Sequence, residues 1–187
     1  MSQPSVPSTG YGTTAMALHW ITAVLVLAAF IMGPGGSELK VYSAARDFDR
    51  EVHEVLGLAV FTLTLFRLGW RAFIPAPPAL PMAAWMERTS RVVQVLLYIL
   101  LLAIPVSAII GAWLEGHPLT LGILGSIPPM IPESRAVGEK VSELHTILGD
   151  AVVWVAGLHA AAALFHHFIL RDVVLTSMLP RRMRRPR

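Results

Sequence analysis

The sequence contains no cysteine and few charged residues, and both shortages restrict what the chain can be. Without cysteine, disulfide bonds, iron–sulfur clusters and thiolate metal sites are excluded. Only 14% of the 187 residues are charged and 55% are hydrophobic, which leaves too little polar surface for a soluble domain of this size. We therefore expect the solvent of this chain to be a lipid bilayer.

Four apolar stretches have lengths near the roughly 20 residues that a membrane-spanning helix needs. They run over about residues 15–33, 52–70, 92–113 and 147–170. Segments rich in Gly, Pro and polar residues separate them, and Pro105 predicts a kink in the third. No basic residue precedes the long first stretch, so we expect it to be retained and not cleaved as a signal peptide. The sequence predicts an all-α membrane protein, with residues 1–187 forming a single four-transmembrane-helix bundle.

Basic residues are distributed unevenly among the predicted loops. Ten of the 15 Lys and Arg residues lie in or beside the link after the second stretch or in the basic C-terminal tail, 171–187. The other two loops share five basic residues, diluted by acids, so the positive-inside rule predicts that both termini are cytoplasmic. In so hydrophobic a chain we interpret the tail as an anchor to anionic membrane lipid, and we expect no nucleic-acid partner.

Seven histidines are candidate functional residues, and six of them lie within or beside the predicted spans. Ionisable residues at membrane depth are functional candidates. A single histidine is explained equally well as a packed, hydrogen-bonded side chain, so the positions of the whole set carry the argument. The seven are His19, His53, His117, His145, His159, His166 and His167.

Helix geometry sorts four of the histidines into two pairs. His53 and His145 stand where the second and fourth spans begin, and these spans run in the same direction, so both lie toward the outer face. His159 follows His145 by 14 residues, which is close to a whole number of turns and about 21 Å of helix. His19 lies near the start of the first span, at the inner depth. We predict that His53 pairs with His145, and His19 with His159.

A pair of facing imidazoles suits a six-coordinate haem iron, whose other four positions belong to the porphyrin. The two pairs therefore predict two haem b groups, with the four histidines as axial ligands of the iron. A flat porphyrin needs small residues one turn from each ligand. Small residues do follow the four histidines at that spacing, although they are also common in membrane helix contacts. They are Ala23, Gly57, Gly149 and Ala163, whereas Leu121, Leu170 and Arg171 follow the other three histidines.

A second histidine on the fourth span could pair with His19. His166 lies on nearly the same face as His159, so on depth alone it competes as the partner of His19. We favour His159 for the small neighbours in GLHAAAAL and for the shorter separation between the two irons. We expect His166 and His167 to lie near the inner headgroups, and His117 to be solvated in an outer loop.

The segments ALHW, VHEVLGL, LHTILGD and GLHAAAALFHHF make the chain similar to the bacterial cytochrome b561 family, over about residues 17–180. The resemblance implies a multi-pass di-haem b protein of the bacterial inner membrane, and it implies the same four ligands: His19, His53, His145 and His159. One departure is visible, because Ser177 stands where the family usually has an arginine before MLP.

The resemblance also implies electron transfer to or from a quinone. One hypothesis is an oxidoreductase, a superoxide oxidase that passes electrons from periplasmic superoxide to ubiquinone. The alternative is a cytochrome b subunit that links quinone to a redox partner protein such as a dehydrogenase or hydrogenase. Two sets of basic residues are candidates for contacts with substrates or haem propionates. Each residue is explained equally well as a solvated loop residue or as an anchor to lipid headgroups. They are Lys40, Arg46, Arg50, Arg135 and Lys140 outside, and Arg67, Arg71, Arg88 and Arg91 inside.

Overall fold

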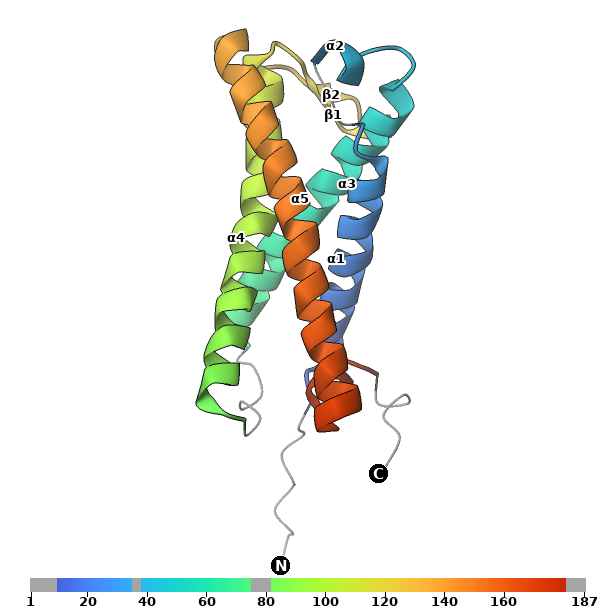
Figure 1. The fold of residues 1–187 in the computed structure, drawn as a ribbon. Coiled ribbons are helices and arrows are strands. Elements are labelled where there is room, and N and C mark those ends of the chain that lie inside the picture. The colour runs from blue at the N-terminus through green and yellow to red at the C-terminus, as the bar shows by residue number, and fades with distance from the viewer. Residues whose placement is uncertain (1–9, 35–37, 75–81, 181–187) are drawn as a thin grey trace, which may run out of the picture.

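The computed structural model describes residues 10–34, 38–74 and 82–180, and four long helices in these ranges run side by side (Figure 1). Each is long and apolar enough to cross a membrane, which confirms the predicted all-α membrane fold. The five terminal arginines of the predicted anchor lie outside the described residues. The four are α1 (Thr13–Met32), α3 (Asp47–Phe73), α4 (Ala84–Leu114) and α5 (Arg135–Phe165), which continues as the π-helix η2 (His166–Leu170).

Three of the helices extend well beyond the apolar stretches that predicted them. α3 begins at Asp47, not near residue 52, and α5 begins at Arg135, not near residue 147. Hydropathy detects only the part of a helix that suits lipid, whereas backbone hydrogen bonding continues into the polar turns beyond it. The expectation that His53 and His145 stand at helix starts was therefore wrong. Both lie inside their helices.

The bundle is built mainly from two helix pairs, α1 with α3 and α4 with α5, and α3 also contacts α4 (Figure 1). Small side chains occupy buried positions in the first pair. Thr22 on α1 and Thr64 on α3 are 3% and 1% exposed. Each hydroxyl donates at 2.7 Å to the carbonyl four residues earlier in its own helix. A small, internally satisfied side chain lets two helices approach closely without leaving a polar group unpaired.

Glycines provide the close approach between α4 and α5. A Cβ on Gly138 would lie 2.7 Å from the Cγ of Glu115, and a Cβ on Gly111 would lie 2.7 Å from the Oγ of Ser142. The Ser142 hydroxyl in turn donates to Glu115 Oε1 at 2.7 Å, and Glu115 is only 4% exposed. The upper parts of these helices are thus joined by a packed, hydrogen-bonded contact.

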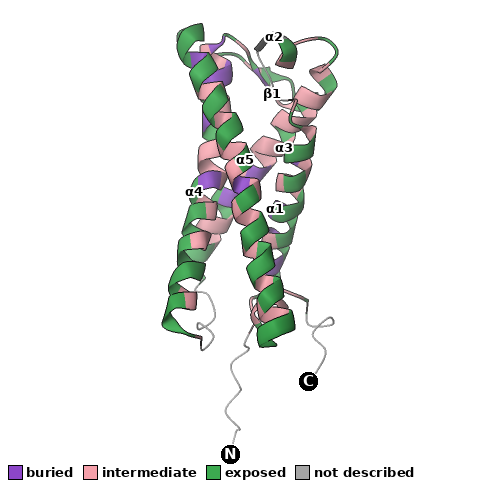
Figure 2. Ribbon diagram, viewed as in Figure 1, coloured by how far each residue is buried: buried purple, intermediate pink, exposed green. Residues whose placement is uncertain are grey.

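Large apolar side chains cover much of the outward surface of the four helices, and the exposed colour dominates there (Figure 2). Ile31 and Trp154, for example, are 69% and 76% exposed. Such a surface is unfavourable in water but ordinary against lipid tails, which need no polar partners. The exposed apolar surface therefore supports the membrane assignment independently of helix length.

The two ends of the bundle differ. One, the hairpin end, carries the helix α2 (Glu38–Val41), the turn η1 (Gly122–Leu124) and the antiparallel strands β1 (Leu119–Thr120) and β2 (Ser126–Ile127) (Figure 1). The other, the α6 end, carries the short helix α6 (Val174–Ser177).

Contacts at the α6 end bring the two ends of the described chain together. The Tyr11 amide donates to the Ser177 carbonyl at 3.3 Å, and the Trp20 indole donates to the Met178 carbonyl at 2.8 Å. Ser177 itself is buried, and its hydroxyl donates to the Val174 carbonyl. At the position where the family pattern expects an arginine, this chain therefore has a small residue whose backbone holds the start of α1.

Candidate functional site

The structure brings both predicted histidine pairs together. His53 on α3 and His145 on α5 face each other toward the hairpin end, with ring centroids 5.9 Å apart and ring planes at 89°. His19 on α1 and His159 on α5 meet toward the α6 end, with ring centroids 6.3 Å apart and planes at 75°. Each pair joins the α1–α3 half of the bundle to the α4–α5 half.

In the pair nearer the hairpin end, both rings are oriented by backbone carbonyls. His53 Nδ1 lies 2.7 Å from the Ala29 oxygen, and His145 Nδ1 lies 2.9 Å from the Ile104 oxygen. A carbonyl can only accept, so each Nδ1 carries the proton and each Nε2 keeps its lone pair. Metal-bound histidines commonly have this arrangement, with the second nitrogen donating to a carbonyl. The two rings are therefore set up to bind a metal through Nε2.

The Ala29 carbonyl becomes available for a local reason. Ala29 lies in the last turn of α1, where carbonyls lack partners four residues on, and the Gly33 amide bonds to Phe30 instead. Gly33 lies beside the ring, since a Cβ there would be in van der Waals contact with the His53 imidazole at 3.5 Å. Ile104 lies in the interior of α4 beside Pro105, and its carbonyl also accepts the Ser107 hydroxyl at 2.8 Å. The carbonyl that Pro105 leaves without a helical donor is that of Leu101, four residues earlier.

The pair nearer the α6 end has a different neighbour. Arg67 on α3 places Nη1 3.4 Å from His19 Nδ1, and its guanidinium carbon lies 5.5 Å from the centroid of the Tyr98 ring on α4. Of the four arginines expected at this end, Arg67 is the one that reaches the histidines. Arg71 and Arg88 are exposed, and Arg91 pairs with Glu87 at 2.5 Å.

The remaining histidines have other contacts. His166 Nδ1 bonds to Asp172 Oδ2 at 2.5 Å, while His159 is the residue that faces His19. The expectation that His117 is solvated was wrong. It is half-buried and stacks on Tyr42, with centroids 3.4 Å apart and planes at 14°, because the loop before β1 folds against the link after α2.

Basic residues at the hairpin end are mostly neutralised. Arg46 pairs with Asp49 at 3.0 Å. Arg50 pairs with Glu54 at 2.9 Å and with Asp47 at 3.2 Å. Glu54 also accepts the backbone amide of β1, so this cluster fixes the hairpin to α3. The cluster borders a cavity of about 540 Å³ whose lining includes Tyr42, Arg50 and His117.

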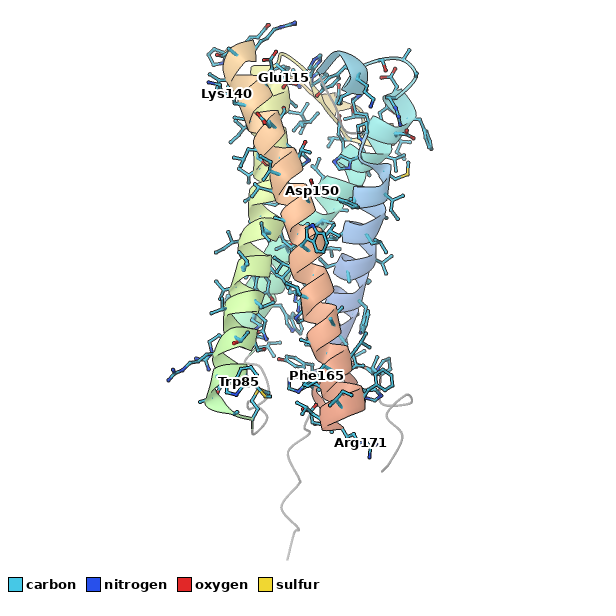
Figure 3. The ribbon with its side chains drawn as sticks, in the orientation of Figure 1. Trp85, Glu115, Lys140, Asp150, Phe165 and Arg171 are labelled. Atoms are coloured by element: carbon cyan, nitrogen blue, oxygen red, sulfur yellow. The ribbon has the colours of Figure 1, made fainter. Side chains whose placement is uncertain are left out.

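Lys40 and Lys140 keep exposed cationic side chains at the same end; Lys140 is labelled in Figure 3 at the top of α5. Arg135 also lies at this end, where it pairs with Glu133 at 2.8 Å. Electrostatic attraction of an anion to the hairpin end would therefore depend mainly on the two lysines.

The separations within both histidine pairs fit the haem that the sequence predicts. Arginine only donates, so the Arg67 contact with His19 Nδ1 would have to open for His19 to bind iron through Nε2. In the described residues no group of three or more His, Cys, Asp or Glu could hold a bare ion, but an iron in a porphyrin needs only two ligands. A metal–imidazole bond of about 2 Å places the centres of two opposed rings roughly 6 Å apart, close to both measured separations. A Cβ on Gly57 or Gly149 would meet nothing within 4 Å, so space is open one turn from His53 and His145.

A four-helix membrane bundle with facing histidines at two depths is the architecture of a membrane di-haem b electron carrier. Comparison with known families gives the particular group. Residues 10–181 match the family model described as prokaryotic cytochrome b561, and the chain belongs to that family.

Individual relatives cover nearly the whole chain. Cytochrome b561 homolog 2 of Escherichia coli K12 is 30% identical over 170 residues, 90% of each protein. Cytochrome b562 of Cereibacter sphaeroides is 30% identical over 176 residues, 91% of this chain and 95% of its own length. The probable superoxide oxidase CybB of Yersinia pestis is 26% identical over 177 residues, 92% of this chain and 97% of its own length.

Proposed function

We propose that this chain is a superoxide:ubiquinone oxidoreductase of the bacterial inner membrane. His53 and His145 hold one haem b near the periplasmic face, and His19 and His159 hold a second near the cytoplasmic face. The hairpin end is periplasmic and both termini are cytoplasmic, as the distribution of basic residues favours. The observation that carries the proposal is the two facing histidine pairs, one toward each end of the bundle.

The histidines determine what chemistry is available. A haem iron with two imidazole ligands stores and releases single electrons and has no open coordination position. Two histidines bound to one iron would leave it no free position for a substrate, which would restrict the reaction to electron transfer. The carbonyls of Ala29 and Ile104 hold two of these rings in the ligating orientation.

The overall reaction balances in electrons and protons. Two superoxide anions each give up one electron and leave as dioxygen. One ubiquinone accepts the two electrons and two protons and becomes ubiquinol. Superoxide is a small anion that crosses a bilayer poorly, so it reacts at one face, which we assign to the hairpin end. The similarity to the Yersinia pestis protein named as a probable superoxide oxidase supports this substrate.

Stopped-flow spectroscopy on the purified holoprotein tests the proposal. Superoxide is mixed anaerobically with the oxidised protein, and haem reduction is followed with and without added ubiquinone. We expect haem reduction that outpaces spontaneous dismutation of superoxide, followed by reoxidation when quinone is present. If superoxide disappears at the same rate with and without the protein, the oxidase function is refuted.

One observation favours an electron-transfer subunit as the second candidate. Ile123 and Leu124 in η1 project from the hairpin end with 104% and 81% of their surface exposed, and most nearby arginines are paired. An apolar projection beside neutralised charges suits a protein partner better than a small anion. This function predicts haems that ubiquinol reduces and superoxide does not, in the same stopped-flow experiment.

A further inference from the structure

Arg67 is a cation on α3, three residues before the end of the apolar stretch 52–70. Among the described residues no Asp or Glu lies within ion-pair distance of its guanidinium, which instead contacts His19 and Tyr98. An arginine this close to a helix end can reach the interface, so it is the contact with His19 that makes Arg67 a functional candidate. His53 and Arg67 are 14 residues apart on α3, the same spacing as His145 and His159 on α5. α3 therefore supplies an imidazole at one pair and a positive charge at the other.

The charges near the other pair, His53 and His145, have the opposite net sign. Arg50 lies one turn before His53, but three carboxylates, those of Asp47, Glu51 and Glu54, lie within 4 Å of its guanidinium. The closest of these contacts, to Glu54, is 2.9 Å, and the side chains of Arg50 and Glu54 are only 13% and 14% exposed. The charges around His53 thus sum to a negative value, whereas the charge beside His19 is positive and is not paired with a carboxylate of the described residues.

We infer that Arg67 is a tuning residue that makes the haem between His19 and His159 the more easily reduced of the two. Adding an electron to a site makes it more negative, so a nearby positive charge stabilises the reduced state. At about 10 Å and an effective dielectric constant of about 20, one charge changes an equilibrium constant roughly tenfold or more. The inference rests on the proposed ligands and gives that function a direction, from the hairpin end toward the α6 end.

The electron-transfer step between the two sites is balanced. With a haem bound at each histidine pair, one electron would leave the site of His53 and His145, oxidising it, and would enter the site of His19 and His159, reducing it. No bond is formed or broken and no proton is required. Arg67 makes the step favourable, because the electron moves from carboxylates toward a cation. Tyr98 keeps the guanidinium in place through its ring face.

Spectroelectrochemical titration of the holoprotein tests the inference without any enzymatic turnover. The haem absorbance of wild type, Arg67→Gln and Arg67→Lys is recorded as a function of potential, and two one-electron components are fitted. We expect Arg67→Gln to lower the higher of the two midpoints by a tenfold change in equilibrium constant, about 59 mV, and to leave the lower midpoint in place. Arg67→Lys keeps the charge and should retain both midpoints.

Arg71→Gln is the matched control, because it removes the same charge one turn further along α3 from an exposed side chain. It should leave both midpoints unchanged. To assign the component, Arg67→Gln is repeated in the His53→Ala background, where the surviving component should carry the whole shift.

Three results would overturn the inference. In the first, Arg67→Gln moves neither midpoint or both equally. In the second, Arg67→Lys shifts as far as Arg67→Gln, so charge is not the cause. In the third, Arg67→Gln loses a haem that Arg67→Lys keeps, so Arg67 holds the cofactor and does not tune it. All three concern potential and haem content, so they are independent of whether superoxide is the donor.

Discussion

Gly57→Leu should remove one of the two haems without unfolding the protein. A Cβ at Gly57 would meet nothing within 4 Å, so a side chain begins there in open space. Leucine also has a higher helix propensity than glycine, by roughly 0.8 kcal/mol. The helix should therefore be at least as stable as before. The leucine would, however, fill the space one turn from His53 that the porphyrin needs.

A pyridine haemochrome assay normalised to protein concentration measures the effect. We expect two haems per chain in the wild type and one in Gly57→Leu, with circular dichroism showing unchanged helix content. Gly69→Leu is the control, since it makes the same change in the same helix, also at a position with nothing within 4 Å of a Cβ. It should keep two haems. Retention of both haems in Gly57→Leu would refute the assignment of this space to a porphyrin, and so would an equal loss in Gly69→Leu.

Three further predictions concern the ligands, the periplasmic surface and the helix contact. His53→Ala should leave one haem by the same assay and His166→Ala should leave two; a haem lost from His166→Ala would show that the ligand on α5 was wrongly chosen. If superoxide is attracted by charge, its rate of reaction should fall with salt, which screens over about 8 Å at physiological ionic strength. Replacing both Lys40 and Lys140 with Gln should weaken the dependence of this rate on salt concentration. An unchanged salt dependence in stopped-flow measurements would contradict the role of the two lysines. Glu115→Ala should lower the stability of the detergent-solubilised protein by about 1–3 kcal/mol, because it removes the carboxylate that accepts a hydrogen bond from the half-buried Ser142 hydroxyl. An unchanged denaturation midpoint would contradict that role.

The sequence was sufficient to predict the four spans and the partners within each histidine pair. Both depend on regular helix geometry, since a 14-residue spacing and a shared direction fix depth and face together. Helix ends could not be predicted from hydropathy, because the polar first turns of α3 and α5 are helical outside the lipid. The acceptors of His53 and His145 were also not predictable. Backbone carbonyls have no side-chain signature, and the release of the Ala29 carbonyl depends on how α1 ends at Gly33.

The position of Arg67 was only partly predictable. The sequence placed four arginines toward one face without distinguishing among them. The spacing of 14 residues from His53 was available as a signal, because it equals the spacing between His145 and His159. What the spacing could not provide was the contact with His19 on another helix, which depends on how α1 packs against α3.

The place of α5 in both histidine pairs has a consequence for biogenesis. A ribosome delivers α1, α3 and α4 to the membrane before α5, so His19 and His53 enter the bilayer before either has its partner. Neither cofactor can be captured between two ligands until α5 has been inserted. If these four histidines are the haem ligands, haem binding between them would follow the insertion of α5 and would link the α1–α3 half of the bundle to the α4–α5 half. Cells short of haem would accumulate fully inserted chains whose two halves lack these fastenings, which gives membrane proteases a means of distinguishing finished from unfinished molecules.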